Sequence, residues 1–174
     1  MEKSFQESNL SGLGMGTWGI GEDASKKKDE LAALRYGLDH GIKVIDTAEM
    51  YGEGKSEKLI GEAIRGYDRS KIFLISKFYP YHASRELERQ SLEKSLKRLG
   101  TDYLDLYLLH WRGNIPLSET VECMEELVKQ GKIKRWGVSN FDTEDMKELW
   151  QVKDGNKCVV NQVLYHLASR GIEY

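Results

Sequence analysis

One unit recurs along the chain: a short apolar run, then a polar loop, then an amphipathic stretch that usually ends in glycine. Near-continuous apolar runs are typical of parallel strands, which are buried on both faces. Five such runs begin 24 to 32 residues apart, at Lys43–Thr47, Ile72–Lys77, Leu104–His110, Arg135–Asn140 and Val159–Leu164. The recurrence predicts an α/β protein with a parallel sheet.

Helical patterns separate these runs, because apolar residues recur there every three or four positions. We expect helices at Leu31–Leu38, Ser56–Gly66, Ser84–Gly100, Ser118–Gly131 and Met146–Trp150. Ser56 is a candidate N-cap, and the glycines are candidate helix ends. Two short runs within Phe5–Thr17 predict a small β-hairpin in front of the first unit. The predicted order is a hairpin followed by five β-α units, with the fifth helix absent or just beginning at Tyr174.

Length and composition predict one globular domain over residues 1–174. Apolar residues make up 40%, and 26 Lys and Arg balance 28 Asp and Glu, for a net charge of −2. This balance gives no reason to expect nucleic acid or a membrane as partner. The N-terminus has no apolar signal core, and Cys123 and Cys158 form no CxxC motif, so we expect a cytoplasmic protein with reduced cysteines. No metal-binding residues are assigned.

Two architectures accept the repeat: a complete five-stranded doubly wound sheet, or about five-eighths of a (β/α)8 TIM barrel. Polar residues at or near the strand ends favour the barrel, which gathers all its strand ends at one mouth. These residues are Asp46, Lys77, His110, Asn140 and Gln162. The glycines of Gly12–Gly16 precede the first unit and do not open a helix, so a Rossmann dinucleotide fingerprint is rejected.

Four residues near the first three strand ends, Asp46, Tyr51, Lys77 and His110, fit acid catalysis at a carbonyl. A phenol with a pKa of about 10 is a weak acid at neutral pH, and a nearby ammonium is expected to lower that pKa. Tyr51 is then the proton donor. Lys77 lowers the pKa of its hydroxyl, and Asp46 holds the Lys77 ammonium in place. A neutral His110 would donate a hydrogen bond to the carbonyl oxygen.

Each of these residues alone has an ordinary structural interpretation. A strand-end aspartate is more often a turn or cap residue, Tyr51 could be loop packing, and Lys77 could be a solvated strand end. An isolated histidine beside Trp111 is more often a core residue. Together, on consecutive strands of a barrel, the catalytic interpretation is the better one.

Five separated motifs, in order, resemble the aldo/keto reductase family. They are Gly41–Gly61 (GIKVIDTAEMYGEGKSEKLIG), Ser76-Lys77, Leu104–Trp111 (LDLYLLHW), Lys132–Asn140 (KIKRWGVSN) and Asn161-Gln162. The resemblance begins at Leu13 and covers essentially the whole chain. Within the family it is nearest to bacterial members that act on small aldehydes such as methylglyoxal.

The resemblance implies a (β/α)8 barrel that transfers hydride from NADPH to an aldehyde or ketone. It places the catalytic tetrad on Asp46, Tyr51, Lys77 and His110. The cofactor-binding residues that it implies are Gly16, Thr17, Trp18, Asp46, Ser139, Asn140 and Gln162. Trp18, Tyr79 and Trp111 would form the wall of the carbonyl pocket, although ordinary aromatic packing is the alternative.

The chain departs from the family in length, because members are roughly twice as long and carry strands six to eight. A five-strand piece exposes two sheet edges, so we expect a truncated chain or self-association. The predicted function is NADPH-dependent carbonyl reduction, with the activity of this chain open. The alternatives are an inactive fragment and a non-catalytic barrel subunit with a regulatory or interaction role, which loss of Tyr51 or Lys77 would indicate.

Overall fold

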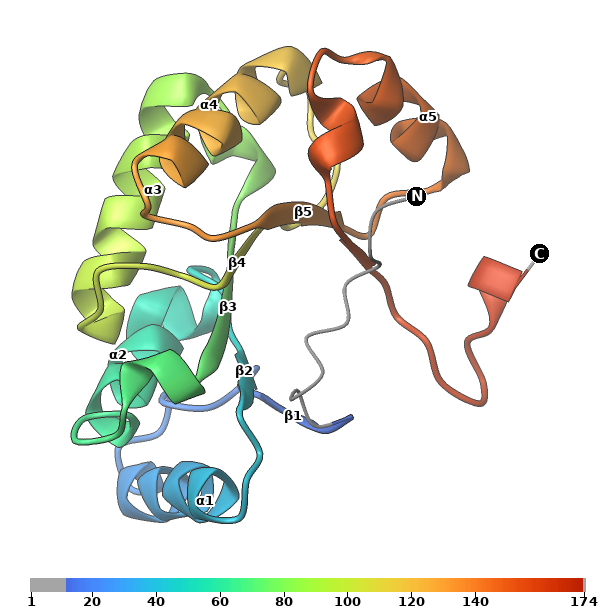
Figure 1. Cartoon of the computed structure of the whole chain (residues 1–174). Coiled ribbons are helices and arrows are strands. Elements are labelled where there is room, and N and C mark those ends of the chain that lie inside the picture. Colours follow the sequence, from blue (N-terminus) through green and yellow to red (C-terminus); the bar gives the residue numbers. More distant parts are fainter. Residues whose placement is uncertain (1–11, 174) are drawn as a thin grey trace.

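The computed structural model describes residues 12–173, and its centre is one curved sheet of parallel strands (Figure 1). Neighbouring strands pair in chain order. The strands are β1 (Gly14–Gly16), β2 (Val44–Asp46), β3 (Phe73–Phe78), β4 (Leu106–Leu109), β5 (Trp136–Ser139) and β6 (Asn161–Gln162). This sequential order excludes the doubly wound alternative, in which the order of strands reverses at a switch point. The barrel-type prediction is confirmed.

The strand count differs from the expected five because of β1. The first part of the predicted hairpin lies outside the described residues. Its second part contains β1, which pairs in parallel with β2, with Gly16 opposite Asp46. The segment Gly14–Gly16 is therefore the first strand of the same sheet and not an element that precedes it. Gly14 lies close to Val44 of β2, where a side chain would contact the Val44 methyl group at 3.2 Å.

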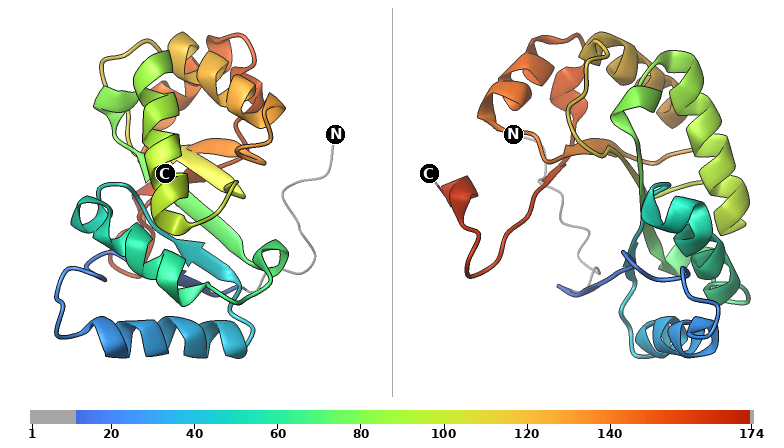
Figure 2. Two further views of the ribbon diagram at one scale, coloured as in Figure 1. Left: turned by 90° about the vertical axis from the view of Figure 1, so that its left-hand side faces the viewer. Right: turned by 180° about the vertical axis from the view of Figure 1, so that it is seen from behind.

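Five α-helices connect the strands and lie along the outer, convex side of the sheet (Figures 1 and 2). They are α1 (Lys27–Asp39), α2 (Lys55–Ala63), α3 (Arg85–Leu99), α4 (Leu117–Lys129) and α5 (Thr143–Gln151). Short 3-10 turns lie at Tyr51–Gly54, Arg69–Lys71, Pro80–His82, Gly155–Lys157 and Gly171–Glu173.

The predicted ends of α3 are confirmed, whereas two other predicted starts are wrong. Ser84 precedes α3, and Gly100 ends it in the left-handed conformation with φ of 65°. Ser56 and Ser118, in contrast, each lie inside the first turn of their helix, because α2 follows Gly54 and α4 follows Pro116. Proline is well suited to a helix start, since its backbone has no N–H to satisfy.

The alternation of side chains along the strands divides the interior into two apolar clusters. Outward side chains such as Leu74, Tyr107 and Val138 pack with the helices in the larger cluster. Inward side chains form the second cluster on the concave side, with Phe73, Ile75, Leu106 and Leu108 as its buried members. Because both faces are buried, the strands read as continuous apolar runs, which is why the repeat was visible in the sequence.

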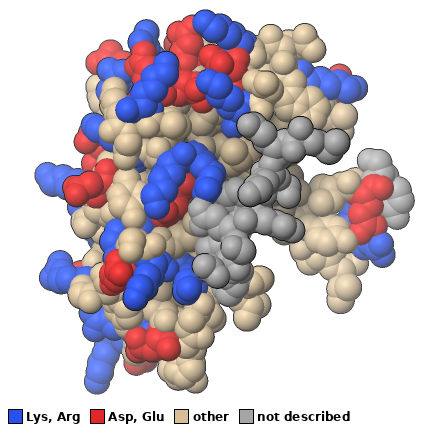
Figure 3. Space-filling model, in the orientation of Figure 1, with Lys and Arg blue, Asp and Glu red and all other residues tan. Residues whose placement is uncertain are grey.

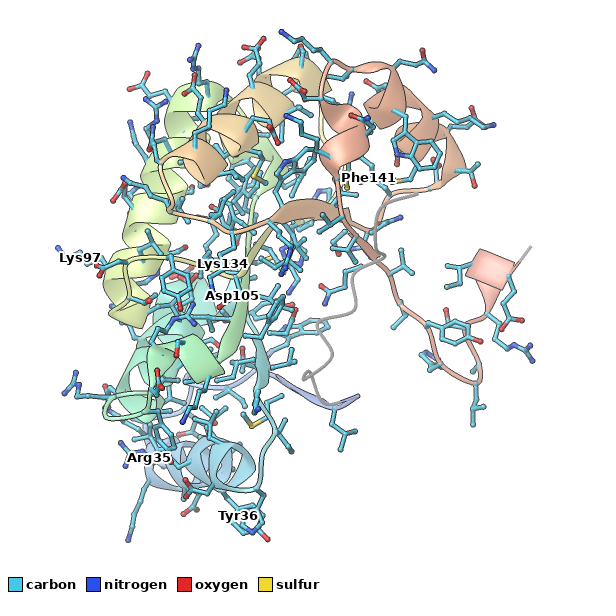
Figure 4. All side chains as sticks on the ribbon, viewed as in Figure 1. Arg35, Tyr36, Lys97, Asp105, Lys134 and Phe141 are labelled. Atoms are coloured by element: carbon cyan, nitrogen blue, oxygen red, sulfur yellow. The ribbon has the colours of Figure 1, made fainter. Side chains whose placement is uncertain are left out.

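A buried aspartate secures the end of the sheet where the strands begin. Asp105, only 4% exposed, lies just before β4 and accepts a hydrogen bond from the backbone N–H of Leu74 at 3.0 Å. Its carboxylate also pairs with Arg69 at 2.8 Å. It pairs with Lys134 as well, at 2.7 Å (Figure 4). Both cations lie over the Tyr103 ring, at 4.1 Å and 4.5 Å from its centroid. Residues at this end of a barrel typically serve stability.

The face of the molecule seen in Figure 3 carries both signs of charge, intermixed. No helix within residues 12–173 is long and apolar enough to cross a membrane. Both cysteines are free: Cys123 is buried and Cys158 is partly buried, as predicted.

Candidate active site

The strand ends bring the predicted polar residues to one edge of the sheet. Asp46 is the last residue of β2, Lys77 lies one residue before the end of β3, and His110 directly follows β4. Ser139 and Gln162 are the last residues of β5 and β6. Because the sheet curls, β6 returns toward β2, and the Gln162 amide Nε2 donates to Asp46 Oδ2 at 2.9 Å. The polar ends therefore form one cluster.

The Lys77 amine is at the centre of this cluster. Lys77 is only 2% exposed, and its Nζ donates to Asp46 Oδ1 at 2.6 Å and to the backbone carbonyl of Thr47 at 2.9 Å. The hydroxyl of Tyr51 lies 3.4 Å from the same nitrogen. The predicted contact among Tyr51, Lys77 and Asp46 is thus present in the structure.

A tight turn after Tyr51 makes this contact possible. Gly52, Glu53 and Gly54 all have φ between 54° and 83°, in the left-handed region, before α2 begins. Glycine adopts this conformation at little cost. At Gly54 space is limiting as well, since a Cβ there would lie 2.6 Å from the Arg98 side chain. The turn directs the chain from β2 into α2 with Tyr51 at its start.

The surroundings of Tyr51 raise its pKa to about 12, mainly through burial and secondly through the Asp46 carboxylate. This corrects the expectation that Lys77 would lower the phenol's pKa. Lys77 is paired with Asp46, so its charge is largely compensated in the resting site. Burial also lowers the pKa of Lys77, and Asp46 opposes that shift. At neutral pH the phenol therefore holds its proton, as a proton donor must.

His110 is neutral at physiological pH, which is the condition that the sequence analysis set for its hydrogen bond to a carbonyl oxygen. Burial and the nearby Lys77 charge lower its pKa to about 4, against a smaller opposing effect of Asp46. The side chain is 7% exposed, and its buried Nδ1 has no hydrogen-bond partner among residues 12–173. A neutral imidazole whose other nitrogen carries the proton can donate one hydrogen bond to a carbonyl oxygen.

Three aromatic side chains lie beside the four predicted catalytic residues, one next to Tyr51 and two on the side of His110. Trp18 stacks on Tyr51 with ring centroids 6.3 Å apart, and Tyr51 meets His110 edge-on at 5.9 Å. Trp111 lies 4.9 Å from the His110 ring and 6.0 Å from Tyr79. Trp18 is 81% exposed, which leaves one face of its ring open to a planar ligand. The structure thus brings the three predicted pocket aromatics to the tetrad.

The three predicted amide-binding residues are neighbours at the ends of β5 and β6. Ser139 Oγ donates to the Gln162 backbone carbonyl at 2.7 Å. Asn140, with φ of 57°, donates through Nδ2 to the His110 carbonyl at 3.0 Å. The side-chain amide oxygens of Asn140 and Gln162 accept no hydrogen bond from the described residues. An amide ligand could therefore donate to either oxygen, so the residues fit a carboxamide such as that of nicotinamide.

Two predicted cofactor residues, Gly16 and Thr17, make their contacts mainly with the backbone of Asp46 in the neighbouring strand. Thr17 is fully buried, and its hydroxyl donates to the backbone carbonyl of Asp46 at 2.9 Å. Its side chain is therefore unavailable to a ligand. Gly16 pairs with Asp46 across the sheet and directly precedes this buried contact.

The sequence analysis missed Glu49, which shapes the pocket wall. Its buried carboxylate Oε1 accepts from the backbone N–H of Tyr79 at 2.7 Å and lies 2.9 Å from His82 Nδ1. Glu49 thereby fixes the turn that carries Tyr79. The sequence did contain a signal for Glu49, because it is an acidic residue between Asp46 and Tyr51, in the loop that carries two of the predicted site residues.

The sequence model of the aldo/keto reductase family matches residues 12–173 of this chain. Methylglyoxal reductase YeaE of Escherichia coli is 58% identical over 166 residues, which cover 95% of this chain and 58% of that protein. Glyoxal reductase of Bacillus subtilis is 37% identical over 160 residues and is covered to 56% of its length. The chain thus spans less than two thirds of these relatives.

Solved structures show the same similarity. An aldo/keto reductase of Klebsiella pneumoniae in complex with NADP and acetate superposes with a TM-score of 0.92 at 61% identity. That match covers 95% of this chain and 58% of the Klebsiella chain. The thermostable aldo-keto reductase Tm1743, in complex with the inhibitor epalrestat, gives a TM-score of 0.90 at 41% identity, covering 99% of this chain and 65% of its own.

Proposed function

This chain belongs to the aldo/keto reductase family, and from that membership we propose that it carries the carbonyl-reducing site of an NADPH-dependent reductase. The substrate class is a small aldehyde or ketone, with methylglyoxal as the first candidate because the Escherichia coli relative is named for it. One observation carries the proposal: the Lys77 amine contacts the Asp46 carboxylate at 2.6 Å and lies 3.4 Å from the Tyr51 hydroxyl.

The roles of the tetrad follow from its geometry. When NADPH is bound, it supplies the hydride that the carbonyl carbon accepts, leaving NADP. Tyr51, protonated at neutral pH, gives its proton to the carbonyl oxygen, and the product is an alcohol. The phenolate that remains is stabilised by the Lys77 charge, which Asp46 holds in place. Neutral His110 orients the carbonyl oxygen by a hydrogen bond.

The residues proposed to hold the cofactor lie around the tetrad. Ser139, Asn140 and Gln162 would bind the carboxamide of the nicotinamide through their hydroxyl and amide groups. Trp18 would lie beside the ring, Asp46 would border it, and Gly16 would contribute its exposed backbone. Thr17 is fully buried, and its backbone N–H donates to the Asp46 carbonyl, so it would act by holding Asp46 in place. Trp18, Tyr79 and Trp111 would enclose the substrate. The marker of a non-catalytic relative, loss of Tyr51 or Lys77, is absent.

NADPH consumption by the 174-residue chain with methylglyoxal tests the proposal. We expect oxidation of NADPH that depends on the aldehyde and yields the corresponding alcohol. Binding of NADPH is followed in parallel by the quenching of tryptophan fluorescence, with circular dichroism as the measure of folding. A folded chain that binds NADPH but leaves methylglyoxal unreduced would contradict the proposed reaction. The cytoplasmic location and self-association stay predictions.

A further inference from the structure

We propose that Ser56 is a positioning residue for the reaction, because its buried hydroxyl fixes the part of the backbone that holds the Lys77 amine. The inference rests on the proposed function, since it concerns the geometry of the proposed proton donor and its lysine. Ser56 is fully buried, so it acts through other residues and contacts neither substrate nor cofactor.

Three fully buried hydroxyls meet where β1, β2 and α2 come together. Ser56 Oγ lies 2.8 Å from Thr17 Oγ1 and 3.1 Å from Thr47 Oγ1. The Thr17 hydroxyl in turn donates to the backbone carbonyl of Asp46 at 2.9 Å. Ser56 is therefore the link between the residue after β1 and the residue after β2.

The direction of this hydrogen-bond chain follows from counting protons, because each hydroxyl has only one to donate. The Thr17 proton goes to the Asp46 carbonyl, which has no proton of its own, so Ser56 donates to Thr17. Its acceptors there are the Thr17 hydroxyl at 2.8 Å and, at 3.2 Å, the Thr17 backbone carbonyl. With the Ser56 proton used, Thr47 must donate to Ser56. The chain runs from Thr47 through Ser56 and Thr17 to Asp46, and hydrogen bonds aligned in this way strengthen one another.

This chain holds the two residues to which Lys77 is bound. The Lys77 amine donates to the Asp46 carboxylate and to the Thr47 carbonyl. The backbone of Asp46 is held by Thr17, and Thr47 is held by Ser56. Ser56 also follows Tyr51 by five residues, so it ties the Tyr51 turn to the end of β2. One hydroxyl thus fixes the phenol and the ammonium relative to each other.

An ordinary capping role does not account for Ser56. The N-cap of α2 is Gly54, and no side-chain capping bond is present at this helix start. Removing the hydroxyl would leave Thr17 without its donor and Thr47 without its acceptor in a dry environment. Such groups rearrange to regain a partner. A shift of the Thr47 carbonyl away from Lys77 would destabilise the ammonium.

The test compares Ser56→Ala with Ser95→Ala, a control at another fully buried helix serine, whose hydroxyl accepts from Arg98. The titration of the Lys77 amine is followed across pH by NMR of its Cε carbon, a readout that does not require access to this 2% exposed side chain. In Ser56→Ala we expect the pH midpoint of the Lys77 titration to fall by roughly half a unit or more, because its ammonium loses an acceptor. We also expect kcat to fall about tenfold to a hundredfold, with KM changed less than about threefold.

Ser95→Ala should leave both quantities as in the wild type. An unchanged Lys77 midpoint in folded Ser56→Ala, or an equal change in Ser95→Ala, would overturn the positioning role. If Ser56→Ala does not fold, Thr47→Val removes the first donor at nearly the same volume and should shift the midpoint in the same direction. An unshifted midpoint in Thr47→Val then rejects the proposal.

The two readouts separate this inference from the proposed function. If the wild type shows no turnover but the Lys77 midpoint of Ser56→Ala still differs from that of the wild type, the hydroxyl chain is supported and the reaction is rejected. Turnover in the wild type, with no change of midpoint or kcat in Ser56→Ala, supports the reaction and rejects the role of Ser56.

Discussion

Gln162 and Asp46 are 116 positions apart in the chain, yet the Gln162 amide donates to the Asp46 carboxylate over 2.9 Å. Three strands separate β2 from β6 in the sheet order, so only the curl of the sheet brings these residues together. The contact places the proposed amide-binding residues beside the proposed tetrad.

Replacing Gln162 by leucine should weaken the binding of NADPH. The substitution removes the amide proposed to bind the nicotinamide carboxamide and leaves Asp46 Oδ2 without its donor. Loss of one or two such hydrogen bonds corresponds to an increase in Kd of about tenfold. Fluorescence titration with NADPH measures the change, and Gln151→Leu at the exposed end of α5 is the control. Equal affinities of wild type and Gln162→Leu would contradict the assigned role.

Tyr51→Phe should abolish carbonyl reduction without unfolding the protein. The substitution removes only the hydroxyl that is proposed to donate the proton, and general acids typically contribute about 10²- to 10⁴-fold to a rate. NADPH oxidation with methylglyoxal measures the loss, beside the exposed control Tyr36→Phe. If Tyr51→Phe keeps most of the wild-type turnover, another group is the acid.

Lys77→Met should cripple turnover and also remove the alkaline limb of the pH profile. The pKa of Lys77 is below its usual value of 10.5, whereas the pKa of Tyr51 is about 12. As pH rises, Lys77 therefore loses its charge before Tyr51 loses its proton, and the wild-type rate should fall through the Lys77 titration. Steady-state rates from pH 6 to 10 measure this, with exposed Lys129→Met as control. Wild-type-like rates in Lys77→Met would refute the role of the lysine.

His110 should make the protein less stable in mild acid. Its pKa is about 4 in the folded state against 6.5 as the ordinary value. Between these pH values the unfolded state binds a proton that the folded state does not, so the free energy of unfolding rises with pH. The full difference corresponds to about 3 kcal/mol. Urea denaturation at pH 4.5 and 7.5 should show a smaller pH dependence in His110→Gln, but not in the exposed control His40→Gln.

Glu88 should have the opposite effect at higher pH. This residue of α3 is fully buried, and the polar groups beside its carboxyl are the Cys123 thiol and the Arg89 guanidinium. Burial raises its pKa well above 4.5, so the folded state keeps a proton that the unfolded state releases. Stability should therefore decline as pH rises above about 4.5.

Glu88→Gln removes this buried acid, and we expect the variant to be about 1–3 kcal/mol more stable than the wild type at pH 8. At pH 5 the difference should be smaller. Chemical denaturation at both values measures it, with Glu86→Gln on the exposed side of the same helix as control. A stability difference that is independent of pH would show that Glu88 does not titrate as described.

The strands could be predicted from the sequence because burial on both faces produces apolar runs. Such runs can be recognised without knowing which strands pair with each other. Leu106–Leu109 is an example, since all four residues are buried. The first strand was misread, because the glycines of Gly14–Gly16 give no apolar run. The start of α2 was wrong for another reason: Ser56 is used in a tertiary hydrogen-bond chain, which a local capping rule does not contain. The start of α4 was wrong because the helix begins directly after Pro116, ahead of Ser118.

The residues of the proposed tetrad could also be predicted from the sequence as a cluster, whereas their pKa shifts could not. Residue types and strand ends pointed to Tyr51, Lys77 and Asp46, and the structure places them in contact. The pKa of Tyr51 depends on how deeply the ring is buried and on how completely Asp46 compensates Lys77. Both are properties of three-dimensional packing, and the prediction from the residue types alone had the wrong sign.

Each strand of the sheet pairs only with the strands that precede and follow it in the chain, and this has a consequence for biosynthesis. Pairing between sequence neighbours closes short loops, so each new β-α unit can add to those already formed as the polypeptide leaves the ribosome. Asp46 and Lys77 lie on β2 and β3, His110 directly follows β4, and Tyr51 lies in the turn between β2 and α2. The groups proposed for proton transfer can thus be assembled by a nascent chain before the residues proposed to bind the nicotinamide carboxamide have been translated.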